Sequence, residues 1–167
     1  HGEYFVKTRG PGDLEQEHMR SRELGYNGYF SDLDLSMDLK VFYDEITGMI
    51  SEPLKNNQYI ASNANRARFS GSEAQFDWRP TLRDRLRLTF AHVDAWASNP
   101  ADRNLSASNS GSAGWMRDWG HGWSSGAFYY GDDALNQYRY ERLDLRVAKR
   151  WRVYGSNLEL AALWQQR

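Results

Sequence analysis

Residues 20–50 have the sequence RSRELGYNGYFSDLDLSMDLKVFYDEITGMI, in which apolar and polar side chains alternate. In the second half one set of alternate positions is apolar and the other polar, apart from Phe42: Leu35, Met37, Leu39, Val41 and Tyr43 against Ser36, Asp38, Lys40 and Asp44. A period of two over nine residues predicts a strand with one apolar face and one hydrated face. Leu24, Tyr26, Gly28 and Phe30 continue the pattern before a polar turn at Ser31–Asp34. The sequence therefore predicts a β-hairpin here.

The same rhythm continues along the chain, and no segment has a convincing helical period. Further strands are predicted at Arg66–Arg79, Arg85–Trp96, Trp123–Gly131, Tyr138–Val153 and Leu158–Gln165. Ser110–Gly122 contains too many glycines to place a strand firmly, although Gly120-His121-Gly122 suits a tight turn. Long polar loops are predicted at Glu52–Asn65, Ala97–Asn109 and Asp132–Gln137, and short turns at Pro80–Asp84 and Gly155–Asn157. The prediction is an all-β antiparallel meander of about eight strands in which short turns alternate with longer loops.

The composition restricts the function classes. The 167 residues have a mean hydropathy of -0.81, although 40% are hydrophobic and seven are Trp and ten Tyr. A barrel strand needs only about 9–11 residues with every second one apolar, so low hydropathy is compatible with a membrane protein. A net charge of -1 argues against a nucleic-acid partner. The absence of cysteine excludes a disulfide framework and a thiolate metal site.

No catalytic, cofactor-binding or metal-binding residue can be assigned from the sequence. The histidines, His1, His18, His92 and His121, lack metal-ligand spacing, and His92 suits an interfacial aromatic position. Asp132-Asp133 is more simply a solvated pair than a cation site, and Asp44-Glu45 is too ordinary a pair to indicate a glycosidase. Ser124 and Ser125 lack a recognisable nucleophile elbow. The chain is therefore predicted to be no enzyme, and its ligand-binding residues stay unassigned.

Aromatic and basic side chains favour a structural interpretation. Rings near the predicted strand ends suit a membrane–water girdle better than a sugar-stacking platform: Tyr26, Tyr43, Trp78, Trp96, Trp151 and Trp164. One row of arginines falls on the polar faces of three strands: Arg79, Arg85, Arg87, Arg142, Arg146, Arg150 and Arg152. In a barrel these arginines would line the lumen and pair with carboxylates or contact a plug domain.

Several segments, taken in their order, resemble the late barrel strands of TonB-dependent outer-membrane receptors. They are ELGYNGYF (Glu23–Phe30), LDLSMDLKVFYDEITGMIS (Leu33–Ser51), SGSEAQFDWRP (Ser70–Pro80), RLDLRVAKR (Arg142–Arg150) and LELAALW (Leu158–Trp164). The third contains the pattern Gly-x-Glu-x-x-x-Asp-Trp-x-Pro. The resemblance implies that residues 19–167 are part of a barrel of about 22 strands, without its plug domain and final strand. Residues 1–18 would be a loop or the end of a preceding strand, with Tyr4–Lys7 as the strand tail.

The resemblance also implies a function and a location. The whole protein would lie in the outer membrane of a Gram-negative cell and import a scarce nutrient, most often a ferric siderophore. Its partners would be this small ligand, the TonB complex through the plug domain, and outer-membrane lipid. The three long loops would recognise the ligand. Two alternatives remain at this point. One is a soluble all-β module, a sandwich or small barrel, that recognises glycans. The other is a complete small outer-membrane barrel of eight strands.

Overall fold

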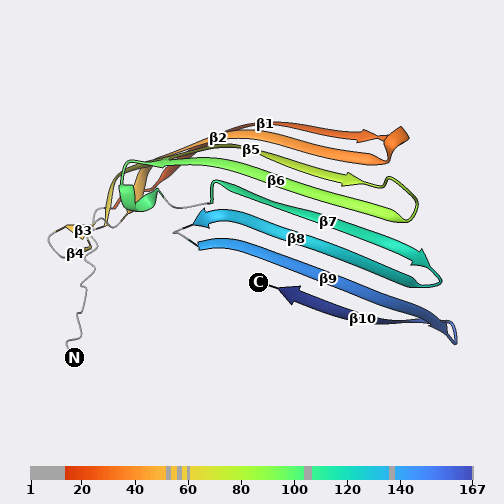
Figure 1. Cartoon of the computed structure of the whole chain (residues 1–167). Helices are drawn as coiled ribbons and strands as arrows, with labels where there is room; N and C mark the ends of the chain where they lie inside the picture. The colour runs from red at the N-terminus through yellow and green to blue at the C-terminus, as the bar shows by residue number, and fades with distance from the viewer. Residues whose placement is uncertain are drawn as a thin grey trace, which may run out of the picture.

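The computed structural model describes residues 14–51, 54–55, 58–59, 61–103, 107–135 and 138–166. Its main feature is one antiparallel sheet of eight strands (Figure 1). The strands are β1 (His18–Phe30), β2 (Leu35–Ser51), β5 (Ser62–Trp78), β6 (Asp84–Ala97), β7 (Asn109–Gly120), β8 (Trp123–Leu135), β9 (Tyr138–Val153) and β10 (Ser156–Gln166). Each main strand pairs with the next in the chain, so the order along the sheet is β1-β2-β5-β6-β7-β8-β9-β10. The predicted eight-stranded meander is confirmed.

Short connections and long connections lie at opposite edges of the sheet. The edge on the right of Figure 1 holds the short helix η1 (Ser31–Leu33) and the turns at 79–83, 121–122 and 154–155; we call it the turn edge. The other edge holds the connections at 52–61, 98–108 and 136–137; we call it the loop edge. The connection at 52–61 contains the two-residue strands β3 (Leu54–Lys55) and β4 (Gln58–Tyr59), and that at 98–108 contains η2 (Pro100–Asp102).

Left-handed residues close the turns between β1 and β2 and between β9 and β10. Asp34 ends η1 with a φ of 46°, and its N–H donates to the carbonyl of Ser31. Tyr154 and Gly155 have φ values of 48° and 85° and join β9 to β10. A two-residue connection with positive φ at both positions matches the right-handed twist of the flanking strands. The predicted turn at Gly155–Asn157 is therefore displaced: Ser156 and Asn157 already belong to β10.

The strand register separates the sheet into two chemically different faces. On the first face, which we call the apolar face, Leu39 lies between Tyr26 of β1 and Ala74 of β5. The same face continues to Leu145 of β9, between Ala127 of β8 and Trp164 of β10. The opposite face, which we call the polar face, carries Asp38, Glu73 and Arg146 along the same strands. The apolar residues predicted in both halves of the chain thus form one continuous surface.

The apolar face is exposed. Leu24 and Leu160 are 74% and 69% accessible, and the buried apolar side chains among the described residues are four alanines. A soluble sandwich would cover this face with a second sheet. The structure has a single layer of main strands in the described residues, which contradicts the sandwich alternative. No helix among the described residues is long and apolar enough to cross a membrane.

The sheet is open. β1 and β10 are its two edge strands and do not pair with each other. A complete eight-stranded barrel would need this pairing to close. The structure therefore contradicts the small-barrel alternative and agrees with an arc of a larger barrel.

Two predicted loops are shorter than the sequence suggested. Ser62–Asn65 belong to β5, where Ser62 pairs with Ser51 and Asn65 with Met49. β8 continues through Asp132 to Leu135, which pairs with Tyr138, so the predicted loop Asp132–Gln137 is mostly strand. Both extensions contain adjacent polar residues, Ser62-Asn63 and Asp132-Asp133, which interrupt the alternation of apolar and polar positions. The loop at Ala97–Asn109 is confirmed within one residue at each end.

β7 forms where the glycine content of Ser110–Gly122 prevented a firm strand prediction. Asn109–Gly120 forms a strand with β6 on one side and β8 on the other, although it contains several glycines. Side chains of the neighbouring strand fill the space beside the glycines: the ring of Phe128 lies where a side chain at Gly114 would be. The predicted turn at Gly120–Gly122 is confirmed, with His121 and Gly122 outside the strands. The predicted strand tail at Tyr4–Lys7 lies outside the described residues, and His18 belongs to β1.

Candidate functional site

Near the turn edge, the polar face carries a first cluster of ion pairs around Asp77. Its carboxylate lies 2.5 Å from Nη2 of Arg85 and 3.0 Å from Nη2 of Arg87. Arg85 also donates through Nε at 2.8 Å, which makes the contact bidentate. Asp77 comes from β5 and both arginines come from β6, so the register of this hairpin creates the cluster. The Asp77 side chain is only 15% exposed, and such paired groups rigidify the strands that hold them.

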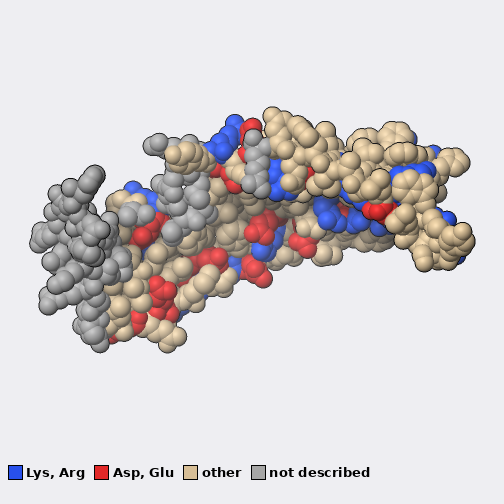
Figure 2. All heavy atoms as spheres, turned by 90° about the horizontal axis from the view of Figure 1, so that it is seen from below, with Lys and Arg blue, Asp and Glu red and all other residues tan. Residues whose placement is uncertain are grey.

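A second cluster lies on β9 and β10. Glu159 accepts from Arg146 and, at 2.9 Å, from Arg150, while Arg142 pairs with Asp144 on its own strand. The prediction that the arginine row pairs with carboxylates of the same face is confirmed for Arg85, Arg87, Arg142, Arg146 and Arg150. In Figure 2, Lys and Arg side chains likewise adjoin Asp and Glu side chains. The pairing explains why the row needs no external anion.

Between these clusters and the loop edge, the polar face contains an open depression of about 440 Å³. Its polar-face side chains come from six strands: Asp38, Glu73, Gln75, Thr89, Ala91, Ser110, Ser112, Tyr130, Asp132 and Tyr140. The small side chains of Ala91, Ser110 and Ser112 form the low centre. The taller side chains stand on both sides, so we call this site the lumenal depression.

Local sequence explains the low centre. β7 begins Asn109-Ser-Gly-Ser-Ala-Gly114, so Ser110 and Ser112 face the depression while Gly111 lies between them. A Cβ at Gly111 would come within 2.8 Å of the Thr89 carbonyl, which makes this position intolerant of a side chain. The hydroxyls of Thr89 and Ser112 are 2.7 Å apart and bridge β6 to β7. The glycine-rich segment that prevented a strand prediction for β7 therefore forms the low centre of the lumenal depression.

The lining favours ligands that donate hydrogen bonds or carry positive charge. Glu73 pairs with Lys40 at 2.8 Å, and Asp38 accepts from the amide of Asn27 at 3.0 Å. Asp132 accepts from the backbone N–H of Tyr140 at 3.2 Å. Carboxylates have several lone pairs, so each retains acceptor capacity toward a ligand. Neither Lys nor Arg is among the described residues that line the depression.

Other residues considered from the sequence have structural partners. His92 shares a hydrogen bond of 2.8 Å with Asn109, whose amide donates to Asp133 at 2.7 Å. Asp132 and Asp133 face opposite sides of β8, so they cannot act together as a cation site. Ser125 accepts from the indole N–H of Trp119 at 2.9 Å. In the part of the chain that the structure describes, no three His, Asp or Glu side chains gather as metal ligands.

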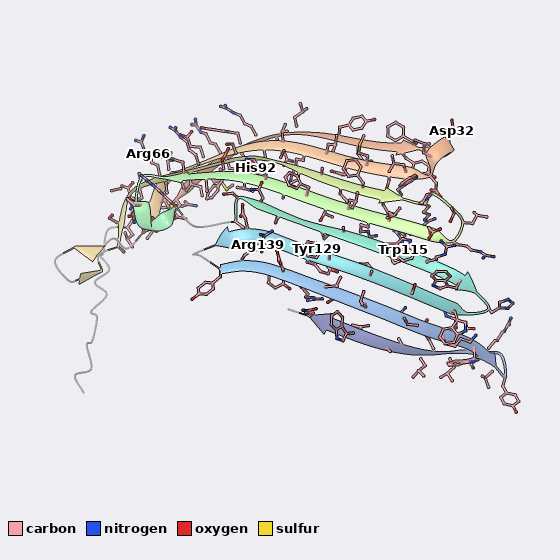
Figure 3. All side chains as sticks on the ribbon, in the orientation of Figure 1. Asp32, Arg66, His92, Trp115, Tyr129 and Arg139 are labelled. Atoms are coloured by element: carbon pink, nitrogen blue, oxygen red, sulfur yellow. The ribbon has the colours of Figure 1, made fainter. Side chains whose placement is uncertain are left out.

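The tryptophans mark the boundaries of the apolar face. Figure 3 shows Trp115 toward the turn edge, and His92 and Arg139 toward the loop edge. Trp78 pairs with Leu35 beside η1, and Trp96 pairs with Arg68 in the half near the loops. Tyr26 departs from the predicted girdle, because it pairs with Leu39 in the middle of the apolar surface. Aromatic rings at both borders of an apolar band are what a membrane-spanning sheet requires.

Comparisons with known proteins agree with this geometry. Residues 1–163 match the family described as "TonB dependent receptor-like, beta-barrel". The solved structure of a protein named "Copper transporter OprC" superposes with a TM-score of 0.66 at 17% identity. That alignment covers 84% of this chain and 25% of OprC, so this chain spans about a quarter of that structure's length. A search of curated protein sequences gives no match.

The family match covers nearly the whole chain, and the fold has its expected features: antiparallel strands, an apolar exterior, a charged interior and alternating turn lengths. The chain belongs to the TonB-dependent receptor β-barrel family, whose members are outer-membrane proteins of Gram-negative bacteria.

Proposed function

We propose that this chain is part of the barrel of a TonB-dependent transporter that imports a scarce nutrient, a ferric siderophore or a similar small ligand. The observation that carries the proposal is the family match over residues 1–163. The charged polar face and exposed apolar face support it, because a transport lumen must be hydrated while the exterior contacts lipid. The plug domain and the segment that contacts TonB belong, in this proposal, to other parts of the full-length protein. Residues 19–167 then form one arc of the barrel.

The lumenal depression is the proposed ligand contact within this arc. Its volume of about 440 Å³ falls within the range of roughly 300–1,000 Å³ of small-molecule sites. Its carboxylates and hydroxyls, with Tyr130 and Tyr140 at one side, suit a chelate that presents N–H, O–H or cationic groups. The fold relative OprC is named a copper transporter, which makes copper complexes the natural competitor to ferric siderophores in a test.

Uptake measurements test the transport proposal. Cells lacking the native gene would be complemented with the full-length protein and supplied with radiolabelled ferric siderophores or copper. Import that requires both the protein and TonB is the expected result. Import that continues unchanged without TonB would overturn the proposal, and import of copper alone would replace the siderophore assignment.

A filled depression tests the ligand contact separately. Ser112→Trp places a large side chain over the low centre and should reduce uptake at limiting ligand without disturbing the apolar face. Ser36→Trp is the matched control, because Ser36 also lies on the polar face but outside the depression. Equal uptake in both variants would show that the ligand does not contact this surface.

Deletion of loop residues tests recognition at the other end of the lumen. Removing residues 104–106 shortens the long connection between β6 and β7 without touching either strand. Loops tolerate such changes better than strands, so the barrel should still show heat-modifiable migration while uptake falls. Normal uptake would place recognition elsewhere, and failed assembly would show that this loop supports the strands.

A further inference from the structure

Near the turn edge, a lysine on the apolar face lacks an anionic partner among the described residues. Lys149 lies on β9 between Val147 and Trp151, four residues before the strand ends at Val153. Within the described part of the chain, no carboxylate pairs with its ammonium group. Arg117, on the same face near the same edge, differs because it pairs with Asp84 at 3.2 Å. The unpaired ammonium is therefore a local feature that the barrel itself does not neutralise.

The protein holds this ammonium group in a defined place. Its Nζ donates to the carbonyl of His121 at 2.5 Å and lies 5.0 Å and 6.0 Å from the ring centres of Trp123 and Trp151. The turn that supplies the carbonyl is itself anchored, since Arg150 donates its N–H to Gly122 at 2.8 Å. An ammonium group has three N–H donors. The carbonyl of His121 takes one of them and leaves donors for another acceptor.

The two neighbouring indoles have unused donors as well. Three tryptophans near the turn edge donate their ring N–H within the protein: Trp78 to Leu33, Trp115 to Asp84 and Trp119 to Ser125. For Trp123 and Trp151, by contrast, no acceptor lies within hydrogen-bond distance among the residues that the structure describes. Trp123 is 48% exposed and Trp151 40%. Two indole N–H groups without an acceptor thus lie beside the Lys149 ammonium group, which lacks an anion.

The position of Lys149 in the membrane indicates what supplies the acceptor. A charge on a lipid-facing barrel surface costs about 2–4 kcal/mol at the bilayer midplane but only about 0–1 kcal/mol near an interface. Lys149 pairs with Trp123, the first residue of β8, so it lies near the turn edge, where the aromatic boundary of the apolar face begins. At that depth the abundant anion is the phosphodiester of a phospholipid headgroup. Its oxygens can accept from the ammonium and from indole N–H groups together.

We propose that Lys149, Trp123 and Trp151 form a binding site for the phosphodiester of a phospholipid in the leaflet at the turn edge. The ammonium supplies the charge, the indoles supply neutral donors, and the acyl chains lie along Val147 and the adjoining apolar face. The site stands on the exterior of the barrel and does not depend on which ligand the lumen transports. It would anchor the β7–β9 part of the barrel at a fixed depth.

Native mass spectrometry of the purified full-length protein tests this site, with phosphatidylglycerol as the probe and diacylglycerol as the phosphate-free comparison. Lys149→Gln should weaken phosphatidylglycerol binding about tenfold, the effect of about 1.4 kcal/mol for one charge-assisted contact. Lys149→Arg should retain binding. Trp123→Phe and Trp151→Phe keep the rings but remove the N–H, and each should weaken binding about threefold.

Two matched controls isolate the site. Trp78→Phe removes an N–H that Leu33 already accepts, and Lys40→Gln removes a lumenal ammonium that Glu73 already pairs. Neither should change lipid binding, and heat-modifiable migration would verify assembly of every variant. The proposal fails if Lys149→Gln binds the lipid like the native protein, if diacylglycerol binds equally well, or if inorganic phosphate displaces the lipid. A loss of phosphatidylglycerol binding in both controls equal to that in Lys149→Gln would also overturn the proposal.

Discussion

Replacing Leu39 with arginine tests the orientation of the whole sheet. Leu39 lies at the centre of the apolar side of β2, four residues from Leu35 and four from Tyr43. The span from Leu35 to Tyr43 is roughly 26 Å along the strand at about 3.3 Å per residue. With a strand tilt of about 40°, this corresponds to about 20 Å along the membrane normal. Leu39 therefore lies close to the bilayer midplane.

The expected cost follows from that depth. Arginine on the lipid face at the midplane destabilises a barrel by about 2–4 kcal/mol, and near either interface by about 0–1 kcal/mol. Leu39→Arg should therefore cost most, and Leu35→Arg and Tyr43→Arg clearly less. Gln75→Arg is the control on the other face, because Gln75 pairs with Asp38 across the strands and faces the lumen. Its cost should be near zero, since water and a carboxylate are close by.

The assay is reversible folding of the full-length protein into lipid vesicles, with the free energy of unfolding measured by urea titration. The loss in the free energy of unfolding should be largest for arginine at position 39, and arginine at position 75 should cause no comparable loss. A flat profile along β2 would show that this face does not cross the bilayer. A larger loss at Gln75 than at Leu39 would mean that the two faces are reversed.

Three further predictions concern the faces, the ion pairs and the turns. Spin labels at Leu39 and Asp38 should differ in accessibility to a lipid-soluble quencher, with only the former quenched; equal quenching would remove the assigned orientation. Asp77→Ala leaves its two arginine partners unpaired and should lower the free energy of unfolding by about 1–3 kcal/mol in the same urea titration. High salt should not lower the free energy of unfolding of the unmutated protein by as much. Gly155→Ala should cost about 1 kcal/mol from backbone strain alone, because a Cβ there meets nothing within 4 Å. Gly122→Ala should cost more, since its Cβ also collides with the carbonyl of Arg150, and a smaller cost at Gly122 would contradict the turn geometry.

Strong alternation was sufficient to predict several elements. The hairpin at Arg20–Ile50 is confirmed because a strand with one face in lipid and one in water must place apolar residues at every second position. The short turns were predictable from local chemistry, since Gly122 and Gly155 adopt positive φ. The apolar residues of β2 and β9 were assigned to one kind of surface before any pairing was known.

Where both faces of a strand contact similar surroundings, apolar and polar residues do not alternate, and the strand could not be predicted from the sequence. At the loop edge, the adjacent polar pairs Ser62-Asn63 of β5 and Asp132-Asp133 of β8 place polar residues on both faces, so these strand ends resembled loops. β7 resembled a flexible segment because glycine has a weak strand preference. Backbone pairing on both sides and the ring of Phe128 over Gly114 hold it in place, and these are contacts that only neighbouring strands provide.

The alternation of residue types is enough to predict that the strands have an apolar and a polar face, because that property is local and repeats every second residue. The tertiary structure alone decided which polar residues meet. Lys40 reaches Glu73, and Arg150 reaches Glu159, through the registers of different strand pairs. The lumenal depression likewise exists only because β6 and β7 place Ala91, Ser110 and Ser112 side by side. A register is set by hydrogen bonds between strands, and a shift of one residue would turn each of these side chains to the opposite face.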